Sequence, residues 1–163
     1  MASNGDVYVC DKENHRIVIL SPHLEFKRAY GSHGKGARRF HHPRDVAFDS
    51  AGNIYVVDSS NFCVKVFTHD FEPLRQIGSE GSQYHHFRSP IGICIDSNNF
   101  VYVTDRNKHC VMVFSPDGEF MMHFGDYGKH VNGLFNHPVG IAADANGQVY
   151  VSDSWNGYVQ IFM

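Results

Sequence analysis

Three polar segments of this sequence contain most of its histidines and several of its arginines. They read GSHGKGARRFHHPR at residues 31–44, GSEGSQYHHFRSP at 78–90 and GDYGKHVNGLFNHP at 125–138. Seven of the twelve histidines lie in these segments, and residues 27–44 include six Lys or Arg and no acidic residue. Cationic groups of this kind bind phosphates and carboxylates, and clustered imidazoles bind metal ions.

A second recurring group is an aspartate that ends an apolar run. Asp11, Asp58, Asp105 and Asp153 occupy this place. Four carboxylates at a fixed spacing raise the possibility of catalysis or calcium binding, but an Asx side chain at a strand end also accepts backbone N–H groups and holds a tight turn. Because catalytic groups usually depart from a repeat, whereas these aspartates define it, we assign them a structural role in the turn.

The aspartates mark an internal repeat with spacings of 47, 47 and 48 residues. Other positions recur in phase with them: Tyr8, Tyr55, Tyr102 and Tyr150; Phe40, Phe87 and Phe135; Pro43, Pro90 and Pro138. The second copy contains four short apolar runs, at 46–49, 54–58, 64–67 and 74–78, separated by turn signals, and no helix is expected. The second run is apolar on both faces of the expected strand, whereas in the third run the side-chain pattern alternates from one residue to the next. Four-strand units at this period predict an all-β fold, a β-propeller.

One domain with four blades is expected from this period. The blades cover about 4–31, 43–78, 90–125 and 138–163. The first unit begins at its second strand and the last ends at its third, so the first and last blades are incomplete. Three strands and three strands do not add up to one four-stranded blade. The chain is therefore expected either to be a piece of a five- or six-bladed propeller or to self-associate, since free strand edges are pairing templates.

Composition and cysteine usage bear on membrane association and on cellular location. The formal net charge is −3 and 42% of the residues are hydrophobic, and no run approaches the ~18 apolar residues of a membrane helix, so no membrane association is expected. The first residues, MASNGDVYVCD, do not resemble a secretory signal. The four cysteines lack zinc-site spacing and fall in apolar runs. We interpret them as buried thiols, which favours a reducing, cytoplasmic location.

The recurring order of proline, an apolar strand, Tyr-Val, aspartate and an aromatic-ended strand resembles the NHL-repeat family. In the first copy, Asn14, His15, Arg16 and Ile17 match the stretch for which the family is named, whereas the later copies read NFCV, KHCV and NGYV at this place. The resemblance extends to the C-terminal NHL domain of tripartite-motif proteins. It implies a propeller that holds protein or RNA on its top face and acts beside ubiquitin-ligase machinery.

The candidate site lies on the top face, defined as the face from which the loops after the second and fourth strands emerge. Acidic residues such as Asp49, Asp70 and Glu72 are expected on the opposite face, which makes the molecule electrically lopsided. The expected contact residues on the top face are Arg28, Lys35, Arg38, Arg39, His41, His42, Arg44, Tyr84, His85, His86, Arg88, Arg106, Lys108, His109, Tyr127 and Trp155.

Three functions compete for these residues. Recognition of a protein partner is favoured, and binding of single-stranded RNA, with cations on phosphates and aromatic rings on bases, is the alternative. A remote third option is a lyase-like metal site at His41, His42, His85, His86 and His137. Adjacent histidines on an extended chain point apart, however, which weakens that option. No nucleophile elbow or phosphate loop is present, so we expect a binding module without catalytic residues, metal or cofactor.

Overall fold

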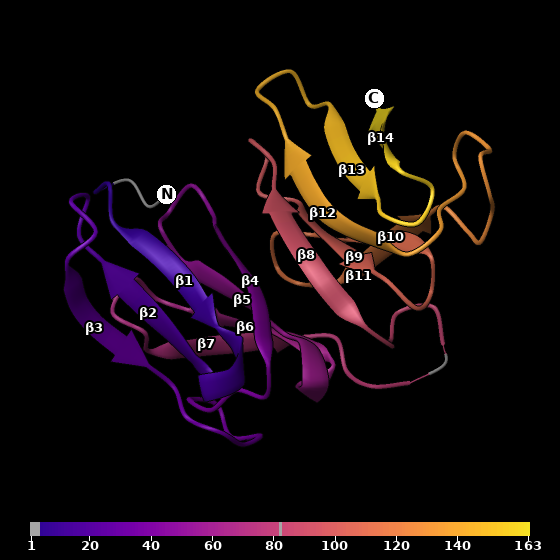
Figure 1. Cartoon of the computed structure of the whole chain (residues 1–163). Helices are drawn as coiled ribbons and strands as arrows, with labels where there is room; N and C mark the ends of the chain where they lie inside the picture. Colours follow the sequence, from indigo (N-terminus) through magenta and orange to yellow (C-terminus); the bar gives the residue numbers. More distant parts are fainter. Residues whose placement is uncertain (1–3, 82) are drawn as a thin grey trace.

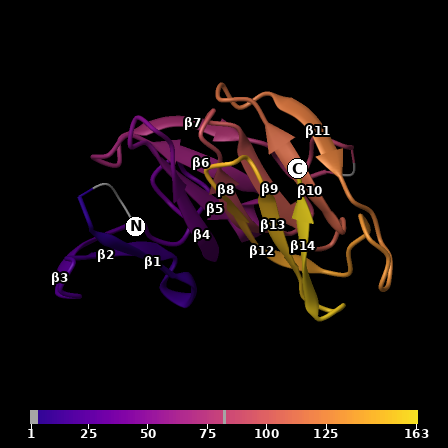
Figure 2. The same cartoon turned by 90° about the horizontal axis from the view of Figure 1, so that it is seen from above.

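The computed structural model describes residues 4–81 and 83–163, which form four antiparallel sheets arranged in an arc (Figures 1 and 2). Each sheet is a blade of consecutive strands. Blade 1 contains β1 (Val7–Asp11), β2 (Arg16–Leu20) and β3 (Phe26–Tyr30), and blade 2 contains β4 (Pro43–Phe48), β5 (Ile54–Asp58), β6 (Cys63–Phe67) and β7 (Pro73–Ile77). Blade 3 contains β8 (Pro90–Ile95), β9 (Val101–Asp105), β10 (Cys110–Phe114) and β11 (Phe120–Phe124), and blade 4 contains β12 (Pro138–Ala143), β13 (Val149–Asp153) and β14 (Tyr158–Phe162).

The arrangement confirms the predicted propeller fold of four repeated blades. Strands β4, β8 and β12 pack side by side as the inner strands, and each begins at one of the recurring prolines. A proline suits this place because it has no backbone N–H to donate to the ladder. Among the residues that the structure describes, blade 1 has no inner strand and blade 4 has no outer strand, which is the predicted strand count.

Two local expectations differ from the structure. The turns after β1 and β5 contain short 3₁₀ helices, at Lys12–Asn14 and Ser59–Asn61. The third strands β6 and β10 are buried along their whole length, so the predicted alternation was wrong. The reason is that blades 2 and 3 have a neighbouring blade on each face, which removes both faces of their central strands from water.

A glycine and a phenylalanine close each connection between blades. Gly78 follows the outer strand of blade 2 with a φ of +72°, and a Cβ at this position would lie 2.4 Å from the ring of Phe87. The same pairing occurs between Gly31 and Phe40 and between Gly125 and Phe135. Only glycine allows both the left-handed backbone and this close approach. The recurring glycines and phenylalanines of the sequence are therefore one structural unit.

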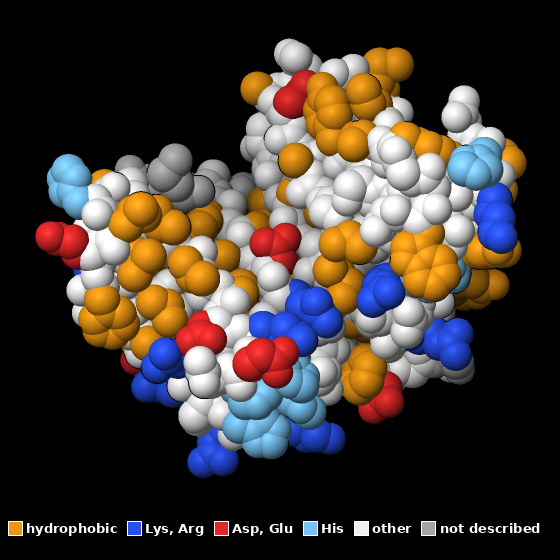
Figure 3. Space-filling model, viewed as in Figure 1, with side chains coloured by type: hydrophobic (Ala, Val, Ile, Leu, Met, Phe, Trp, Pro, Cys, Tyr) orange, Lys and Arg blue, Asp and Glu red, His pale blue; other side chains and the backbone are white. Residues whose placement is uncertain are grey.

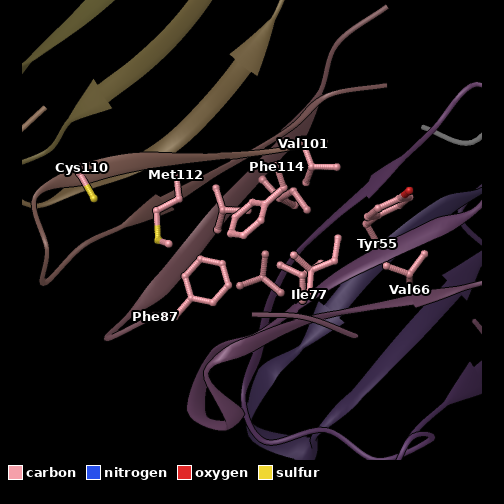
Figure 4. Close-up of a cluster of buried hydrophobic side chains, with 12 residues drawn as sticks. Tyr55, Val66, Ile77, Phe87, Val101, Cys110, Met112 and Phe114 are labelled. Carbon is pink, nitrogen blue, oxygen red and sulfur yellow. The ribbon is translucent and has the colours of Figure 1, made fainter. Parts of the chain in front are cut away.

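Each phenylalanine lies in an apolar cluster between two blades. Figure 4 shows the cluster between blades 2 and 3, where Tyr55, Val66 and Ile77 from blade 2 face Val101 and Phe114 from blade 3. The burial of such apolar surface is the main favourable term in folding. The blades therefore hold one another through their faces, while hydrogen bonds hold the strands within each blade.

Polar contacts at the inner rim add specific links between blades. Thr104 Oγ1 donates to the carbonyl oxygen of Val139 at 2.7 Å and accepts from the backbone N–H of Gly92 at 2.8 Å. Asp45 on β4 accepts from the backbone N–H of Ile93 on β8 at 2.9 Å. Burial raises the pKa of Asp45, although its hydrogen bonds from Ile93 and Val46 oppose this. These links fix the spacing of neighbouring inner strands.

The cysteines are four free thiols. Cys63, Cys94 and Cys110 are buried and Cys10 is partly buried. Burial raises the pKa of each thiol to about 12, which keeps it protonated and unreactive near neutral pH. Within the described ranges, no helix is long and apolar enough to cross a bilayer.

Candidate functional site

The repeated aspartates fix the backbone of the top face. Asp58 is fully buried and accepts from the backbone N–H of His41 at 2.6 Å, from the Asn61 side chain at 2.7 Å and from Lys65 Nζ at 2.8 Å. His41 belongs to the connection that precedes β4, and Asn61 belongs to the turn after β5. The carboxylate therefore ties the connection between blades to the turn beside it.

The equivalent aspartates of blades 3 and 4 do the same. Asp105 accepts from the backbone N–H groups of Arg88 at 2.7 Å and Ser89 at 3.1 Å, and Asp153 accepts from that of Asn136 at 2.7 Å. The sequence suggested aspartates that hold their own turns, but most of these backbone donors lie on the preceding connection.

Asp11 differs from the other three aspartates because no connection precedes it within the described residues. It accepts only from Asn14 and from Arg16, with Arg16 Nε at 2.8 Å. Its carboxylate therefore holds its own turn, as the sequence suggested for all four.

A histidine latch joins the turn of one blade to the residue that immediately precedes the first strand of the next blade. His15 ends the turn after β1 with a φ of 56°, and its Nδ1 accepts from the backbone N–H of His42 at 3.1 Å. His109 ends the turn after β9 with the same φ, and its Nδ1 accepts from the backbone N–H of His137 at 3.2 Å. Because Nδ1 is the acceptor in each ring, the ring proton of the neutral form lies on Nε2.

The top face has three equivalent places between neighbouring blades, which we call junctions, and the two latches lie at the first and the third. The first junction, between blades 1 and 2, contains His15, His33, His41 and His42. The second, between blades 2 and 3, contains Phe62, Glu80 and Arg88 around a cavity of about 270 Å³. The third, between blades 3 and 4, contains His109, Tyr127, Asn136, His137 and Trp155. The backbone frame is repeated, while the side chains differ.

Four imidazole rings fill the first junction. The rings of His15 and His33 are 4.6 Å apart between centroids, and those of His41 and His42 are also 4.6 Å apart. His42 Nδ1 lies 3.0 Å from Ser60 Oγ. In Figure 3, histidine side chains gather at the lower edge of the view beside acidic and basic groups. Burial, with repulsion from His33 and His42, lowers the pKa of His15, so this ring is neutral at pH 7.

The structure separates the histidines that a shared metal site would require. His41 and His42 lie at the first junction and His137 at the third, while His85 and His86 contact each other in the connection between blades 2 and 3. Across residues 4–81 and 83–163, no group of three or more His, Cys, Asp or Glu is arranged to hold a metal ion.

The expectation that adjacent histidines point apart was wrong. The φ of His42 is +55°, and its ring approaches that of His41. The left-handed backbone turns the two side chains to the same side, whereas the sequence pattern suggested an extended chain.

The third junction is hollow, whereas four imidazole rings meet at the first. A cavity of about 460 Å³ is lined by His109, Tyr127, Lys129, His137 and Trp155. The indole of Trp155 stacks on His137 with a centroid distance of 3.8 Å, and Tyr127 contacts the edge of His109. Tyr127 and Trp155 nevertheless remain more than half exposed. Their rings are held in place by one neighbour and are accessible to a ligand.

A second cavity of about 430 Å³ adjoins the third junction and shares His109 with it. Its lining includes Tyr84, Arg88, Lys108 and His123. The exposed ring of Tyr84 stacks on His123 at 5.4 Å, and Lys108 Nζ donates to the carbonyl oxygen of Gln83 at 2.6 Å. Burial lowers the pKa of Lys108. Lys108 therefore supports the backbone beside Tyr84.

The basic connection between blades 1 and 2 does not present all its cations on the top face. Arg38 forms an ion pair with Glu72, a residue expected on the opposite face, so the predicted separation of charge was wrong at this pair. The Lys65 ammonium holds the connection against blade 2 by donating to the carbonyl oxygens of Gly36 at 3.0 Å and Arg39 at 2.5 Å. Because Lys65 holds the connection in this way, the side chain of Arg38 runs along blade 2 toward Glu72.

The remaining predicted cations are distributed over several places. Arg28 lies on the outer strand β3 over the ring of Tyr30, and Arg106 donates its backbone N–H to Ser89. Lys35, Arg39, Arg44 and Arg88 are exposed or partly exposed, and within the described ranges they form no ion pair. The third junction with its adjoining cavity thus unites Tyr84, Arg88, Lys108, His109, Tyr127 and Trp155, whereas the other predicted residues lie elsewhere.

Several residues of these junctions were missed in the sequence. His15 and His33 complete the first junction, His123 and Lys129 line the cavities, and Lys65 holds the basic connection. The alignment of the repeats contained a signal for His15, because His15 and His109 occupy the same repeat position. Lys65 also had a signal, because it places a cation on a third strand where most other copies of the repeat have an apolar residue. No comparable pattern indicated the other three.

Comparison with known proteins identifies the family. The model of the NHL repeat matches residues 1–20, 40–67, 87–114 and 135–162, which together make up more than half of the sequence. The chain therefore belongs to the NHL-repeat family. A comparison with curated proteins gives no match.

Solved structures share the fold at low sequence identity. Streptogramin B lyase is 15% identical with a TM-score of 0.70, and the match covers 99% of this chain and 52% of that one. A chain of the nidogen/laminin complex is 22% identical with a TM-score of 0.70, covering 94% and 54%. An auxiliary nutrient binding protein from Bacteroides thetaiotaomicron is 17% identical with a TM-score of 0.70, covering 98% and 46%. This chain thus spans about half the length of these structures.

Proposed function

We propose that this chain is a protein-binding module without catalytic activity, and that the third junction receives a segment of the partner. The observation that carries the proposal is the pair of adjoining cavities at His109, framed by the exposed rings of Tyr84, Tyr127 and Trp155. Tyr, Trp and Arg are the residues most enriched among those that dominate the energy of protein interfaces. Arg88 lines the adjoining cavity of about 430 Å³ and supplies the arginine of this set.

The geometry also lowers the cost of binding. Trp155 and Tyr84 are already stacked on His137 and His123, so little side-chain entropy is lost when a partner covers their free faces. The surrounding backbone is held by Asp105 and Asp153. A preorganised surface with shallow cavities suits an extended peptide better than a flat domain surface.

The comparisons support this proposal only in general terms. One structural neighbour was solved in a complex of nidogen with laminin, which shows that a similar fold occurs in a protein assembly. The lyase among the neighbours is 15% identical, and this likeness concerns the fold. A role beside ubiquitin-ligase machinery follows from the family resemblance, and a cytoplasmic location follows from the free, buried thiols. Both belong to the same proposal.

Single-stranded RNA is the second candidate ligand. Arg39, Arg44 and Arg88 are cations at the surface that form no ion pair within the described residues, and Tyr84 offers a free ring face for a base. These cations are spread over two connections and an inner strand, whereas the aromatic rings concentrate at one junction. This distribution favours the protein ligand.

The test uses peptides selected for binding to the intact chain from a random library, followed by titration calorimetry. Trp155→Ala is expected to weaken binding of the selected peptides at least tenfold, because it removes an anchor of the interface. Met121→Ala, at an exposed side chain on β11, is the matched control and is expected to leave the affinity unchanged. Selected peptides that bind both variants as tightly as the parent chain contradict the proposed site.

An RNA arm distinguishes the second candidate. Fluorescence anisotropy with a pool of labelled single-stranded RNA is expected to show weak binding that disappears near physiological salt, as for non-specific contacts with phosphate. Micromolar or tighter RNA binding at that salt concentration, combined with failure to select any peptide, favours RNA over protein.

A further inference from the structure

Within residues 4–81 and 83–163, each end blade leaves one apolar sheet face uncovered. On blade 1 the face is formed by Val7, Val9, Leu20 and Phe26, which we call the head face; Val7 pairs with Leu20, and Leu20 with Phe26. On blade 4 it is formed by Tyr150, Val159 and Ile161, which we call the tail face, with Tyr150 paired to Ile161. In Figure 3, hydrophobic side chains gather over the sheet of β1–β3 and over that of β12–β14.

The head face has the residue pattern of a face that packs against a preceding blade. In the repeat, Val7, Val9 and Leu20 correspond to Ile54, Val56 and Phe67. Those three residues of blade 2 are at most 1% exposed because blade 1 covers them. Val9, in contrast, is 41% exposed.

The tail face has the pattern of a face that packs against a following blade. Val159 and Ile161 correspond to Val111 and Val113 of blade 3, one repeat earlier. Val111 is fully buried in the cluster that includes Val151 of blade 4, whereas Val159 is 59% exposed. An apolar side chain with this much exposure on a central blade position lacks the contact that the repeat provides elsewhere.

Each of the three apolar contacts between neighbouring blades of the chain uses the same two positions of the repeat. Ile17 lies in one buried cluster with Val56, Val64 lies with Val103, and Val111 lies with Val151. The first member of each pair is on the third strand of a blade, and the second is on the second strand of the next blade. The fourth pair of this series is Val159 with Val9, which lie at opposite ends of the arc.

We propose that a second copy of this chain covers these faces, with the tail face of each copy packed on the head face of the other. The contact continues the arrangement between blades that is already present three times in the chain. The chain matches about half the length of propeller-like structures at a TM-score of 0.70, so two arcs contain about as many residues as one such chain.

Head-to-tail contacts either close into a ring or extend into a filament. The curvature of the arc favours closure, since Figure 2 shows β1–β3 and β12–β14 at the two ends of a strongly bent array. Two contacts related by a two-fold axis then bury both head faces and both tail faces. This inference is independent of the ligand proposed for the third junction.

The first test is the molar mass of the intact chain, measured by light scattering after size exclusion over a range of concentrations. The expected mass is twice the chain mass of 18.4 kDa. Val9→Lys and Val159→Glu are each expected to shift the population to monomer, because each places an unpaired charge in an apolar contact. Leu74→Lys, at an exposed side chain on β7, is the matched control and is expected to remain dimeric.

Mixing Val9→Lys with Val159→Glu tests the head-to-tail arrangement directly. In the mixed pair, one contact brings the introduced ammonium and the introduced carboxylate together, and the other contact joins two unchanged faces. The dimer is therefore expected to return only in the mixture. Circular dichroism of each variant verifies that it remains folded. A monomeric parent chain at all concentrations, filaments of unlimited mass, or folded variants that dimerise alone would overturn the proposal.

Discussion

The first and third junctions have the same backbone frame but differ in their interiors, because imidazole rings meet in the first and a cavity lies in the third. Each has a latch in which a histidine Nδ1 accepts a backbone N–H, at 3.1 Å from His15 to His42 and at 3.2 Å from His109 to His137. Where the first junction has His33 and His41, the third has Tyr127 and Asn136.

These exchanges change what the junction can do. The imidazoles of the first junction contact one another, while the third contains a cavity of about 460 Å³ rimmed by exposed rings. In a repeat protein the recurring residues build the frame, and the residues that differ between copies create a binding site.

The largest effect is expected from removing a buried aspartate of the frame. Asp58→Asn leaves the nearly buried Lys65 ammonium without its carboxylate, and breaking such a pair costs about 3–5 kcal/mol of unfolding free energy. Asp11→Asn is the matched control, because its partner Arg16 is exposed to solvent, and it is expected to cost much less. Urea unfolding of both variants measures the difference. Equal losses would show that the aspartates do not hold the junctions.

The glycine at the start of each connection provides the next effect. Gly78→Ala is expected to lower the unfolding free energy by about 1–3 kcal/mol, because its Cβ would collide with the buried ring of Phe87. Gly52→Ala shares the positive φ, at +81°, but has no atom within 4 Å of the new Cβ. Thermal unfolding of the two variants separates the collision from the backbone strain. A Gly78→Ala protein as stable as Gly52→Ala would contradict the packing described for this connection.

Much of the frame was predictable from the repeat. The period of 47 or 48 residues gave the four blades, the strand count and the inner position of the prolines, because local patterning and burial repeat together. The contents of the junctions were less predictable. The latch between His15 and His42 joins residues 27 positions apart, and the left-handed φ of His42 has no sequence signal, since glycine is the residue expected there.

The basic connection shows a second limit of prediction. Its charge composition suggested a cationic patch on one face. The direction of Arg38, however, depends on the bonds from Lys65 to the carbonyl oxygens of Gly36 and Arg39. Lys65 lies on β6, the third strand of blade 2, at a repeat position that is apolar in most other copies. This departure from the repeat was the sequence signal that Lys65 has a special role.

Histidine rings at the first and third junctions predict a pH dependence that distinguishes the junctions from the rest of the fold. Burial lowers the pKa of His15 and of His137, with further lowering by neighbouring histidines. Their neutral forms are therefore favoured by folding. This stability is complete above the unfolded pKa of about 6.5 and is lost as the pH falls through the lower folded pKa. Protonation of His15 at Nδ1 would also break its bond from His42.

Thermal unfolding between pH 7.5 and pH 5 is the measurement for this dependence. His15→Asn removes one of the titrating groups, and the loss of stability on acidification is expected to become smaller in this variant. His23→Asn is the control, because His23 is exposed in the turn between β2 and β3. This variant is expected to keep the pH dependence of stability that the parent chain shows. Stability that rises on acidification, or that depends on pH equally in His15→Asn and in the parent, would contradict the latch.

The smallest effect on folding is expected from the basic connection. Arg39→Glu changes an exposed cation that forms no ion pair among the described residues, so the unfolding free energy should change by no more than about 0.5 kcal/mol. Any RNA binding by the parent chain should weaken in Arg39→Glu, with a salt slope shallower by about 0.7 on a log-log plot.

Arg38→Glu is the companion variant, because Arg38 is already paired with Glu72. It is expected to alter RNA binding less than Arg39→Glu does. Anisotropy titrations at several salt concentrations compare the two, and a larger loss of RNA affinity in Arg38→Glu would show that the ion pair does not restrict Arg38.

Photo-crosslinking at equivalent positions of the two junctions tests the proposed protein-binding site most directly. A benzophenone amino acid is placed at Tyr127 in one variant and at His33 in another, and each variant is irradiated with the peptide selected on the parent chain. We expect a covalent peptide adduct from position 127 and little or none from position 33, because the third junction is open and the first is filled by imidazole rings. Equal yields at both positions, or adduct only from position 33, would contradict the proposed site.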